Sequence, residues 1–420
     1  MQRSRVSRHE AFLRILFGTD FLRDFGVRFW DGTTLEPRGD CRFRLLVNSA
    51  AGLRAAFTPP LDLNAGRAFV RNLLDVDGNL EAAIDALMRA QNGLSSLRSV
   101  RLALALLRLP RGKSSPDGLR EVHLHGKLHT RSRDRAAIAF HYDQPVAFYQ
   151  TFLDPAMVYS CGYFASGAST LDEAQGAKLD YVLDKLRLQP GERFLDVGCG
   201  WGALVVRAAQ RGARALGITL SAKQYEEANR RIAAAGIQDR ARVELRDYRD
   251  LSGDVFDKIA SIGMVEHVGR AKLPEYFGAA FRALRAGGVF LNHGIAEAYD
   301  GRHDGKARGF IDRSVFPDGE LVPIAETLRF AEHAGFEVRD VESLREHYAM
   351  TLRAWVSNLE RNRGTAIGIA GEAAYRTWRL YMAGSAQGFA SGRMGIFQTL
   401  LAKPDGGRVD LPLTRADLYQ

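Results

Sequence analysis

The pattern of hydrophobic and polar residues changes near Arg193. Beyond it, short apolar runs alternate with segments of helical periodicity, such as 203–213 and 221–236. Runs of this kind are typical of buried strands, and they occupy 193–198, 215–220, 243–248, 256–263, 287–295, 336–344 and 395–404. Because strands that alternate with helices form βαβ units, the pattern predicts an α/β fold with a doubly wound, mostly parallel sheet.

The segments before residue 193 are more varied. Strand-like pieces at 25–37, 41–47 and 53–60 are separated by turns, and Asp31-Gly32 is a hairpin signal. Helical stretches are expected at 79–90 and 94–109. These features predict a smaller α+β N-terminal domain.

The second of these helical stretches carries two stripes. Val100, Ala103, Leu104 and Leu107 share one face. A separate stripe is made by Arg98, Arg101 and Arg108.

A loop rich in Pro, Gly and Ser follows at 110–118, and the very basic stretch 123–135 is not expected in a core. We therefore expect an N-terminal domain over 1–118, a basic linker over 119–140 and a C-terminal domain over 141–420. Between the last two strands, 347–362 and 373–390 look helical and rich in aromatic residues.

Composition narrows the class of protein. With 420 residues, 46% of them hydrophobic and 25% charged, the chain is unlike a disordered, collagenous or disulfide-stapled protein. Its three cysteines favour a reducing compartment. The apolar stretch 11–17 contains Arg14 and no small-residue cleavage site follows it, so we expect no signal peptide. No apolar run reaches the roughly 18 residues that cross a bilayer. The predicted location is cytoplasmic.

The net charge of +9 is unevenly distributed. Residues 1–140 hold 23 Lys and Arg against 14 Asp and Glu, whereas 141–420 hold 35 of each kind. All of the excess positive charge therefore lies in the first third. This asymmetry indicates an anionic partner, either nucleic acid or a membrane surface. The alternative is a solvated basic surface without a partner.

The strongest local motif is DVGCGWG at 196–202, directly after the first predicted strand. Its three glycines allow a tight turn at a helix N-terminus, which a ligand can approach closely. An NAD site needs an acidic residue about 20 positions on, but 217–221 reads GITLS. Asp196, before the glycines, suits the cationic amino-acid tail of S-adenosylmethionine (SAM). A turn kept only for packing is the alternative.

The ends of later strands carry further polar residues. Asp247 and Tyr248 follow the third strand, where they are suited to bind and stack on adenine, and Glu266 and His267 follow the fourth. In open α/β sheets, ligands bind beyond the carboxyl ends of the strands. These strand ends therefore converge on one predicted crevice.

Seven motifs occur in the order expected of one family. They are YSCGYF at 159–164, DVGCGWG, GITLS with Gln224, RDYRD at 246–250, GMVEHVG at 263–269, NHGI at 292–295 and HYAMTL at 347–352. On these motifs the chain resembles the cyclopropane-fatty-acyl-phospholipid synthases and the related mycolic-acid cyclopropane synthases. The resemblance covers 141–420, and 1–130 is only loosely similar to the N-terminal domain of the phospholipid-acting members.

The resemblance implies a class I SAM-dependent methyltransferase with a seven-stranded sheet. It implies methylene transfer from SAM to the cis double bond of a membrane phospholipid acyl chain, through a carbocation that a bound bicarbonate deprotonates. The implied SAM-binding residues are Tyr159, Ser160, Asp196, Gly198, Gly200, Gly202, Thr219, Leu220, Gln224, Asp247 and Tyr248. The implied catalytic residues around bicarbonate are Cys161, Glu266, His293, Ile295 through its backbone, and Tyr348.

Each catalytic candidate has a structural alternative. Cys161 is also suited to a buried apolar position, Glu266 to capping a helix, His293 to a satisfied core position and Tyr348 to packing. Two positions depart from the family pattern. Gly294 stands where many phospholipid-acting members carry a larger residue, which is expected to widen the pocket. Tyr248 replaces a tryptophan of some relatives.

Other functions remain to be weighed. Related enzymes leave a methyl or methylene branch on the fatty acid or methylate a small amine, and the latter is the main alternative. The absence of an acidic residue at 217–221, after the second predicted strand, disfavours an NAD-dependent oxidoreductase. Nucleic-acid methyltransferases that modify an exocyclic amine typically carry a short Pro-rich catalytic tetrapeptide after the fourth strand. This chain has MVEHVG there instead, which disfavours that function. A lipid-binding protein without catalysis is hard to reconcile with the SAM motifs.

The basic N-terminal third is expected to hold the enzyme peripherally on anionic phospholipid at the inner face of the cell membrane. Residues 94–108 and 120–135 would supply the charge. The aromatic helices after Tyr348 are expected to shelter the acyl chain. The resemblance is also compatible with a homodimer.

Overall fold

A computed structural model describes residues 2–112, 121–122, 124, 126–142, 144–165, 169–298, 309–409 and 411–418. The chain forms two compact units. One draws on 1–123, 305–315 and 359–387, and the other on 124–304, 316–358 and 388–420. Each unit is therefore built from three stretches of chain. The continuous boundaries given above, at 118 and 140, remain a prediction.

The second unit is built on a seven-stranded sheet with the order β10-β11-β9-β8-β5-β6-β7. The strands β5 to β9 pair in parallel, and β11 is antiparallel to both β9 and β10. The bounds are β5 (Arg193–Val197), β6 (Arg214–Thr219), β7 (Ala241–Leu245), β8 (Phe256–Ile262), β9 (Leu284–Glu297), β10 (Glu337–Ser343) and β11 (Met394–Ala402). The predicted α/β fold with a doubly wound, mostly parallel sheet is confirmed.

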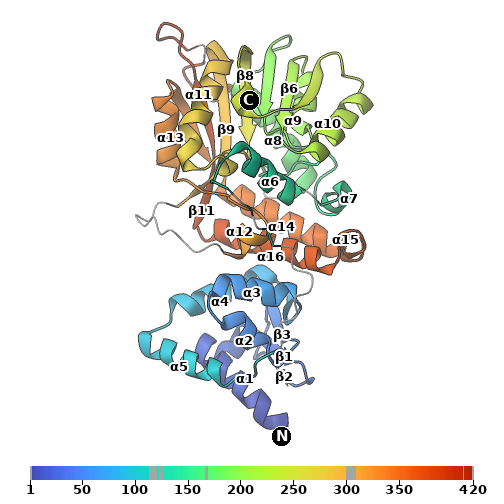
Figure 1. The fold of residues 1–420 in the computed structure, drawn as a ribbon, viewed down its shortest axis with the longest axis vertical. Coiled ribbons are helices and arrows are strands. Elements are labelled where there is room, and N and C mark those ends of the chain that lie inside the picture. The colour runs from blue at the N-terminus through green and yellow to red at the C-terminus, as the bar shows by residue number, and fades with distance from the viewer. Residues whose placement is uncertain are drawn as a thin grey trace. The chain divides into compact units, whose positions relative to one another are not determined.

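Helices cover both faces of this sheet, as Figure 1 shows. One hydrophobic core lies between the sheet and the helices α8 (Leu171–Leu186), α9 (Ala203–Gln210) and α10 (Ala222–Ala234). A second core lies between the opposite face and the helices α11 (Leu273–Ala283) and α13 (Ile324–His333). With both faces buried, the carboxyl ends of the parallel strands are the positions where polar loops can gather.

Two further helices of the second unit, α6 (Arg131–Tyr142) and α7 (Val146–Tyr149), precede the sheet, and α14 (Arg345–Arg361) begins after β10. Short 3₁₀ helices are η2 (Tyr248–Asp250), η3 (Val265–His267), η4 (Arg270–Lys272) and η5 (Ala416–Leu418).

The basic stretch 123–135 differs from expectation. Arg133 is buried and donates from Nε and Nη2 to the Asp318 carboxylate at 2.5 and 2.9 Å, and His129 is also buried. The expectation that this stretch stays out of a core was wrong for these two residues, because a carboxylate compensates the buried guanidinium.

The first unit contains a four-stranded sheet, β2-β1-β3-β4. Its strands are β1 (Gly26–Phe29), β2 (Thr34–Leu35), β3 (Phe43–Val47) and β4 (Leu74–Gly78). Its helices are α1 (Gln2–Phe17), η1 (Phe21–Arg23), α2 (Gly52–Phe57), α3 (Leu61–Val70), α4 (Leu80–Asn92), α5 (Ser96–Leu107), α12 (Phe310–Ser314), α15 (Arg363–Ala370) and the part of α16 (Glu372–Ala390) up to residue 387. The predicted α+β N-terminal region is confirmed.

Two local expectations for the first unit have opposite outcomes. The hairpin at Asp31-Gly32 is confirmed, because β1 and β2 pair antiparallel and Gly32 adopts φ +85°. The prediction of a strand at 53–60 is wrong, since residues 52–57 form the helix α2. Alanine favours a helix strongly, and the pair Pro59-Pro60 then ends it after one and a half turns.

Among the described residues, no helix is long and apolar enough to cross a bilayer. Cys41, Cys161 and Cys199 are free thiols.

Candidate active site

The glycine motif forms a turn between β5 and α9. Gly198, Gly200 and Gly202 have φ of +77°, +54° and +84°, values that side-chain-bearing residues rarely adopt. The amides of Gly198 and Cys199 both donate to the Ile218 carbonyl at 3.0 Å, which ties the turn to β6. The turn forms the floor of a crevice at the carboxyl ends of the parallel strands.

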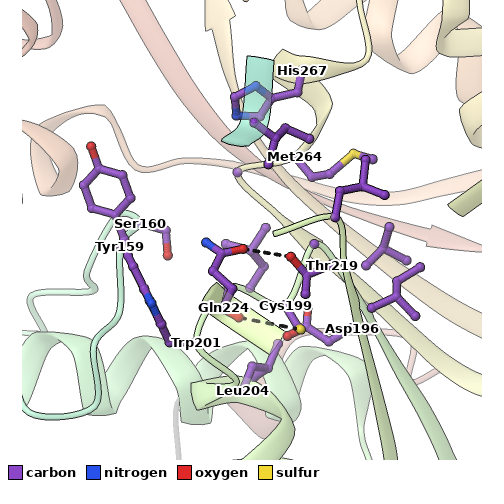
Figure 2. Close-up of a pocket in the computed structure, with 18 of the residues that line it drawn as sticks. Tyr159, Ser160, Asp196, Cys199, Trp201, Leu204, Thr219, Gln224, Met264 and His267 are labelled. Atoms are coloured by element: carbon purple, nitrogen blue, oxygen red, sulfur yellow. Dashed lines mark hydrogen bonds between the residues drawn. The ribbon is translucent and has the colours of Figure 1, made fainter. Parts of the chain in front are cut away.

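Most of the predicted SAM-binding residues line this crevice. Figure 2 shows Tyr159 and Ser160 on one side of it, with Thr219 and Gln224 across from them and Asp196 below. Gly198, Gly200, Leu220 and Tyr248 also belong to the lining. This arrangement follows from the topology, because loops after neighbouring parallel strands meet at one edge of the sheet.

Two predicted SAM-binding residues lie outside the lining. Gly202 begins α9, and a Cβ atom there would come within 3.0 Å of the Ala228 Cβ, so this glycine serves close helix packing. Asp247 accepts from the Arg249 side chain at 2.6 and 2.8 Å, and Arg249 itself lines the crevice. A contact between Asp247 and adenine remains a prediction.

Asp196 is the buried carboxylate of the crevice. Burial raises its pKa to about 7, and the nearby Lys178 ammonium opposes this shift. A cationic ligand group would stabilise the ionised form. At the end of β6, the position of an NAD-binding acid, Thr219 instead donates to the Gln224 amide oxygen at 2.8 Å. The charge pattern of the crevice therefore suits a donor with an ammonium group.

Sequence reasoning missed several lining residues. Asp134, Ile138 and Tyr142 of α6 face the crevice at a spacing of four residues, and this apolar–polar periodicity was the available signal. Trp201, inside the glycine motif, packs its ring against Tyr149 and Tyr159, with centroids 4.8 and 6.3 Å apart. These rings form an apolar wall.

Glu266 and Ile295, two predicted catalytic residues, are in direct contact behind the crevice. The Ile295 amide donates to Glu266 Oε1 at 2.7 Å, and Glu266 Oε2 is buried with no hydrogen-bond partner among the described residues. Burial raises the Glu266 pKa to about 7, although the Ile295 amide opposes the shift. The carboxyl group can therefore exchange a proton near neutral pH.

Gly294 permits this contact. A Cβ atom at Gly294 would lie 2.2 Å from the Val265 Cγ1 atom, so the side chain of Val265 occupies that space. The expectation that Gly294 widens the pocket was wrong. The missing side chain instead lets η3, which carries Val265 and Glu266, approach β9.

His293 lies two residues before Ile295 on β9, so the two side chains point to the same face of the sheet. The Nδ1 atom of His293 lies 3.4 Å from Nε2 of Gln398, which is the residue of β11 that pairs with His293 in the sheet. The Gln398 Oε1 atom accepts from Lys185 Nζ at 2.9 Å, and Lys185 is also ion-paired with Glu342. Because the Gln398 oxygen accepts from Lys185, the NH₂ group of Gln398 faces His293 Nδ1. Nδ1 is then the acceptor, and the proton of the neutral imidazole lies on Nε2.

His293 Nε2 is buried without a hydrogen-bond partner among the described residues. Burial, together with the charges of Lys178 and Lys185, holds the His293 pKa well below its usual range. The imidazole is thus a neutral hydrogen-bond donor.

Cys161 lies in the loop before α8 and Tyr348 in the first turn of α14, and both contact the Leu344 carbonyl. The Cys161 thiol is buried, with its Sγ atom 3.8 Å from the Leu344 carbonyl, and burial raises its pKa above the usual range. Tyr348 Nα donates to the same carbonyl at 3.1 Å, and its ring packs on Phe389 at 4.7 Å. Leu344 in turn donates to Ile396, the partner of Ile295 in the sheet. Hydrogen bonds and strand pairing through Leu344, Ile396 and β9 therefore link the segments that carry the five candidates.

Comparison with known proteins agrees with this geometry. Residues 129–399 match the family model described as mycolic acid cyclopropane synthetase. A probable fatty acid methyltransferase of Pseudomonas putida is 40% identical, over 94% of this chain and 96% of its own. A tuberculostearic acid methyltransferase of Mycobacterium tuberculosis is 36% identical, over 66% of each chain. The mycolic acid cyclopropane synthase CmaA1, solved with SAH and CTAB, superposes with a TM-score of 0.60 and 36% identity. That match covers 64% of this chain and 98% of CmaA1.

The glycine turn supplies a first prediction. An added Cβ at Gly200 would meet no protein atom within 4 Å, so a side chain there enters the crevice, at a φ that valine tolerates poorly. We expect Gly200→Val to abolish binding of S-adenosylhomocysteine (SAH) in calorimetry while the circular dichroism spectrum is retained. Gly253→Val, at another open glycine with φ +80°, should bind SAH normally. Unchanged affinity in Gly200→Val would mean that the crevice is wrongly assigned.

Asp196 supplies a second prediction. Because its pKa is raised to about 7 and the ionised form should hold the donor ammonium, SAH affinity should fall as pH drops below 7. Once protonation dominates, the loss should approach about tenfold per pH unit. Asp196→Asn should bind weakly with no such slope between pH 5 and 7, whereas Glu266→Gln should keep the slope. A slope that persists in Asp196→Asn would assign the titration to another group.

Proposed function

Because the chain belongs to the mycolic acid cyclopropane synthetase family of SAM-dependent methyltransferases, we propose that it forms a cyclopropane ring on a cis double bond of a phospholipid acyl chain. The family acts on fatty-acyl chains, and the names of the relatives include both cyclopropane synthases and fatty acid methyltransferases. The ring product and the phospholipid substrate are our proposal.

The reaction places three demands on the site. An unactivated alkene is a weak nucleophile, so its π electrons must be held against the sulfonium methyl group in a site without water. Attack forms a carbon–carbon bond, releases SAH and leaves a carbocation on the neighbouring carbon. A base then removes a proton from the transferred methyl group, and that electron pair closes the ring. The rings of Tyr159 and Trp201, which line the crevice, help to exclude water from it.

A bicarbonate ion fits the residues behind the crevice. Glu266 Oε2 and His293 Nε2 are buried polar atoms without a partner among the described residues, one an acceptor or acid and the other a donor. A bicarbonate oxygen can accept from His293, and its hydroxyl group can donate to Glu266. When bound, this ion would supply the base. Cys161, Tyr348 and the Ile295 amide would complete the surroundings.

The roles of the protein groups follow from their environments. Glu266, with a pKa near 7, holds or accepts a proton at Oε2 while Oε1 stays fixed on Ile295. His293 is kept neutral and donates from Nε2, so it orients an anion and does not act as the base. The pair of unpartnered buried atoms on Glu266 and His293 is the observation that carries the proposal.

Two alternatives lead to different products. Quenching the same carbocation without ring closure gives a methyl or methylene branch, and the likeness to a tuberculostearic acid methyltransferase keeps this reaction in view. Methylation of a small amine needs no proton acceptor at the methyl carbon. Loss of a proton from the transferred methyl carbon also gives the methylene branch after a hydride shift, so the buried polar atoms of Glu266 and His293 favour ring closure and the methylene branch over amine methylation.

The product decides among them. The full-length chain would be expressed in a bacterial host that lacks cyclic fatty acids, and its fatty-acid methyl esters analysed by mass spectrometry and NMR. We expect one added methylene on monounsaturated chains, with upfield ring-proton signals. A branched ester would overturn ring closure, and unaltered lipids would overturn the acyl substrate.

Glu266 carries a third prediction. Glu266→Gln keeps the contact with Ile295 but removes the titrating oxygen. We expect turnover to fall by about 100-fold or more, typical for loss of an acid–base group, with SAH affinity changed less than about threefold. Equal losses in both would indicate that Glu266 binds the donor. Full activity would exclude it from the reaction.

We also propose peripheral docking on anionic phospholipid through α5. Leu97, Val100, Leu104 and Leu107 are 53–63% exposed and form one stripe along this helix. The opposite side packs on α1, where Arg98 donates to the carbonyls of Ile15 and Leu16. Arg98 is therefore not available to lipid, contrary to the sequence expectation. Arg101 and Arg108 are exposed beside the stripe and suit anionic headgroups.

The basic stretch 120–135 adds less to docking than its sequence indicates. Arg133 is buried on Asp318, and Arg131 pairs with Asp250 at 2.7 Å. Their charges are compensated within the second unit, so α5 is the better candidate for the docking surface.

Docking carries a fourth prediction. The double variant Val100→Asp/Leu104→Asp should lower co-sedimentation with phosphatidylglycerol vesicles by about tenfold or more, since it places charge on the inserted face. Arg101→Gln/Arg108→Gln should weaken binding mainly at low salt, by about 1 kcal/mol per charge. Leu128→Asp, at an equally exposed leucine of the second unit, is the control. Equal binding to neutral and anionic vesicles would contradict the proposal.

A further inference from the structure

Lys178 is a buried cation that the reaction scheme does not use. It belongs to α8, is 2% exposed and lines the SAM crevice. Its ammonium donates to Ser160 Oγ at 2.9 Å, and among the described residues no carboxylate lies within 4 Å of it. A buried ammonium is costly unless an anion or several hydrogen bonds compensate it. The surroundings of Lys178 therefore indicate an anionic ligand group.

The loop that carries Ser160 is held in place by the same helix. Gln175 lies one turn before Lys178 and donates from Nε2 to the Ser160 carbonyl at 2.9 Å. On the preceding side, the Asp154 carboxylate accepts from the amides of Ala156 and Val158 at 2.9 and 2.8 Å. Ser160 is thus fixed at the edge of the crevice, where Figure 2 shows it beside Tyr159.

The direction of the hydrogen bond decides what Ser160 offers to a ligand. An ammonium group has only donors, so the Ser160 oxygen accepts from Lys178 and its own hydrogen is left to donate. Both residues line the crevice, and Ser160 is the more exposed of the two. Together they present a hydroxyl donor that a cation polarises.

The acidic groups around Lys178 leave it charged near neutral pH. Burial lowers its pKa to about 8, and Asp154, Cys161 and Asp196 oppose the shift. Asp154 is occupied by backbone amides, and Cys161 is protonated because burial raises its pKa. Asp196 lines the same crevice as Lys178, and its carboxylate lies beyond the 4 Å that defines an ion pair with the Lys178 ammonium. One carboxylate and one ammonium therefore face the crevice as separate groups.

We propose that Lys178 and Ser160 bind the α-carboxylate of the SAM amino-acid tail, while Asp196 binds its α-ammonium. The tail of SAM carries one charge of each sign on a single carbon, and the two protein charges match this pair. The assignment makes Lys178 a binding residue for the donor that the glycine motif alone does not identify.

The test compares ligands that differ in one charged group. Calorimetry on the full-length chain would measure SAM, decarboxylated SAM, which keeps the ammonium, and 5′-methylthioadenosine, which lacks the whole tail. Lys178→Met should lower the affinity for SAM by about 10- to 100-fold, the range for loss of a charge-assisted hydrogen bond. The affinities for the other two ligands should change by less than about threefold. Wild type should prefer SAM over decarboxylated SAM, and the variant should lose that preference.

Two variants control for the loss of any buried lysine. Lys185→Met removes the other buried lysine of α8, which pairs with Glu342 outside the crevice, and it should bind SAM normally. Ser160→Ala keeps Lys178 and should reduce the preference for SAM even if Lys178→Met does not fold.

Three outcomes would overturn the proposal. Equal weakening of all three ligands would make Lys178 a structural residue. An unchanged preference for SAM in both Lys178→Met and Ser160→Ala would exclude the carboxylate contact. Loss of bicarbonate dependence, with SAM binding intact, would assign the lysine to the pocket behind the crevice.

Discussion

Two buried lysines on one helix contact two separate parts of the candidate site. Lys178 and Lys185 lie seven residues apart on α8, so they share a face about 10 Å apart along the axis, and they are 2% and 1% exposed. Burying an ammonium is costly, and each lysine must be compensated where it lies. Lys178 bonds to Ser160 at the crevice, and Lys185 bonds to Glu342 and Gln398 behind it. The position of α8 therefore fixes the loop around Ser160 and the amide that orients His293.

The buried ionisable groups of the candidate site differ in the form that they take near neutral pH. Asp196 and Glu266 are both buried carboxyl groups with pKa values of about 7, so each can be ionised or protonated near neutral pH. His293 is forced to stay neutral by burial and by the two lysines. These environments are compatible with a cationic donor that binds beside a group able to exchange a proton. A positively charged residue in place of His293 would face the charges of Lys178 and Lys185 as a third cation.

The fold and the crevice were readable from the sequence because their signals are local. The glycines of DVGCGWG predict a turn within the motif itself. The apolar runs predict buried parallel strands, whose carboxyl ends lie at the same edge of the sheet. The buried lysines were not readable, because a lysine within a helical pattern normally indicates a solvated face. Arg133 was misjudged for the same reason: its partner, Asp318, is far away in sequence. Short segments such as 52–57 were ambiguous because alanine-rich pieces fit more than one structure.

Gly294 leaves room for the Val265 side chain and so lets η3 approach β9. A larger residue there would displace Val265, and η3 would retreat from β9 with Glu266 on it. The Ile295 amide would then lose its acceptor, and the Glu266 carboxyl group would lose the contact that fixes it. The Ile295 amide that fixes Glu266 belongs to the backbone of β9, so this contact does not depend on the rotamer of any β9 side chain. The Glu266 carboxyl group is therefore held at Oε1, while Oε2 has no hydrogen-bond partner among the described residues and can exchange a proton near neutral pH.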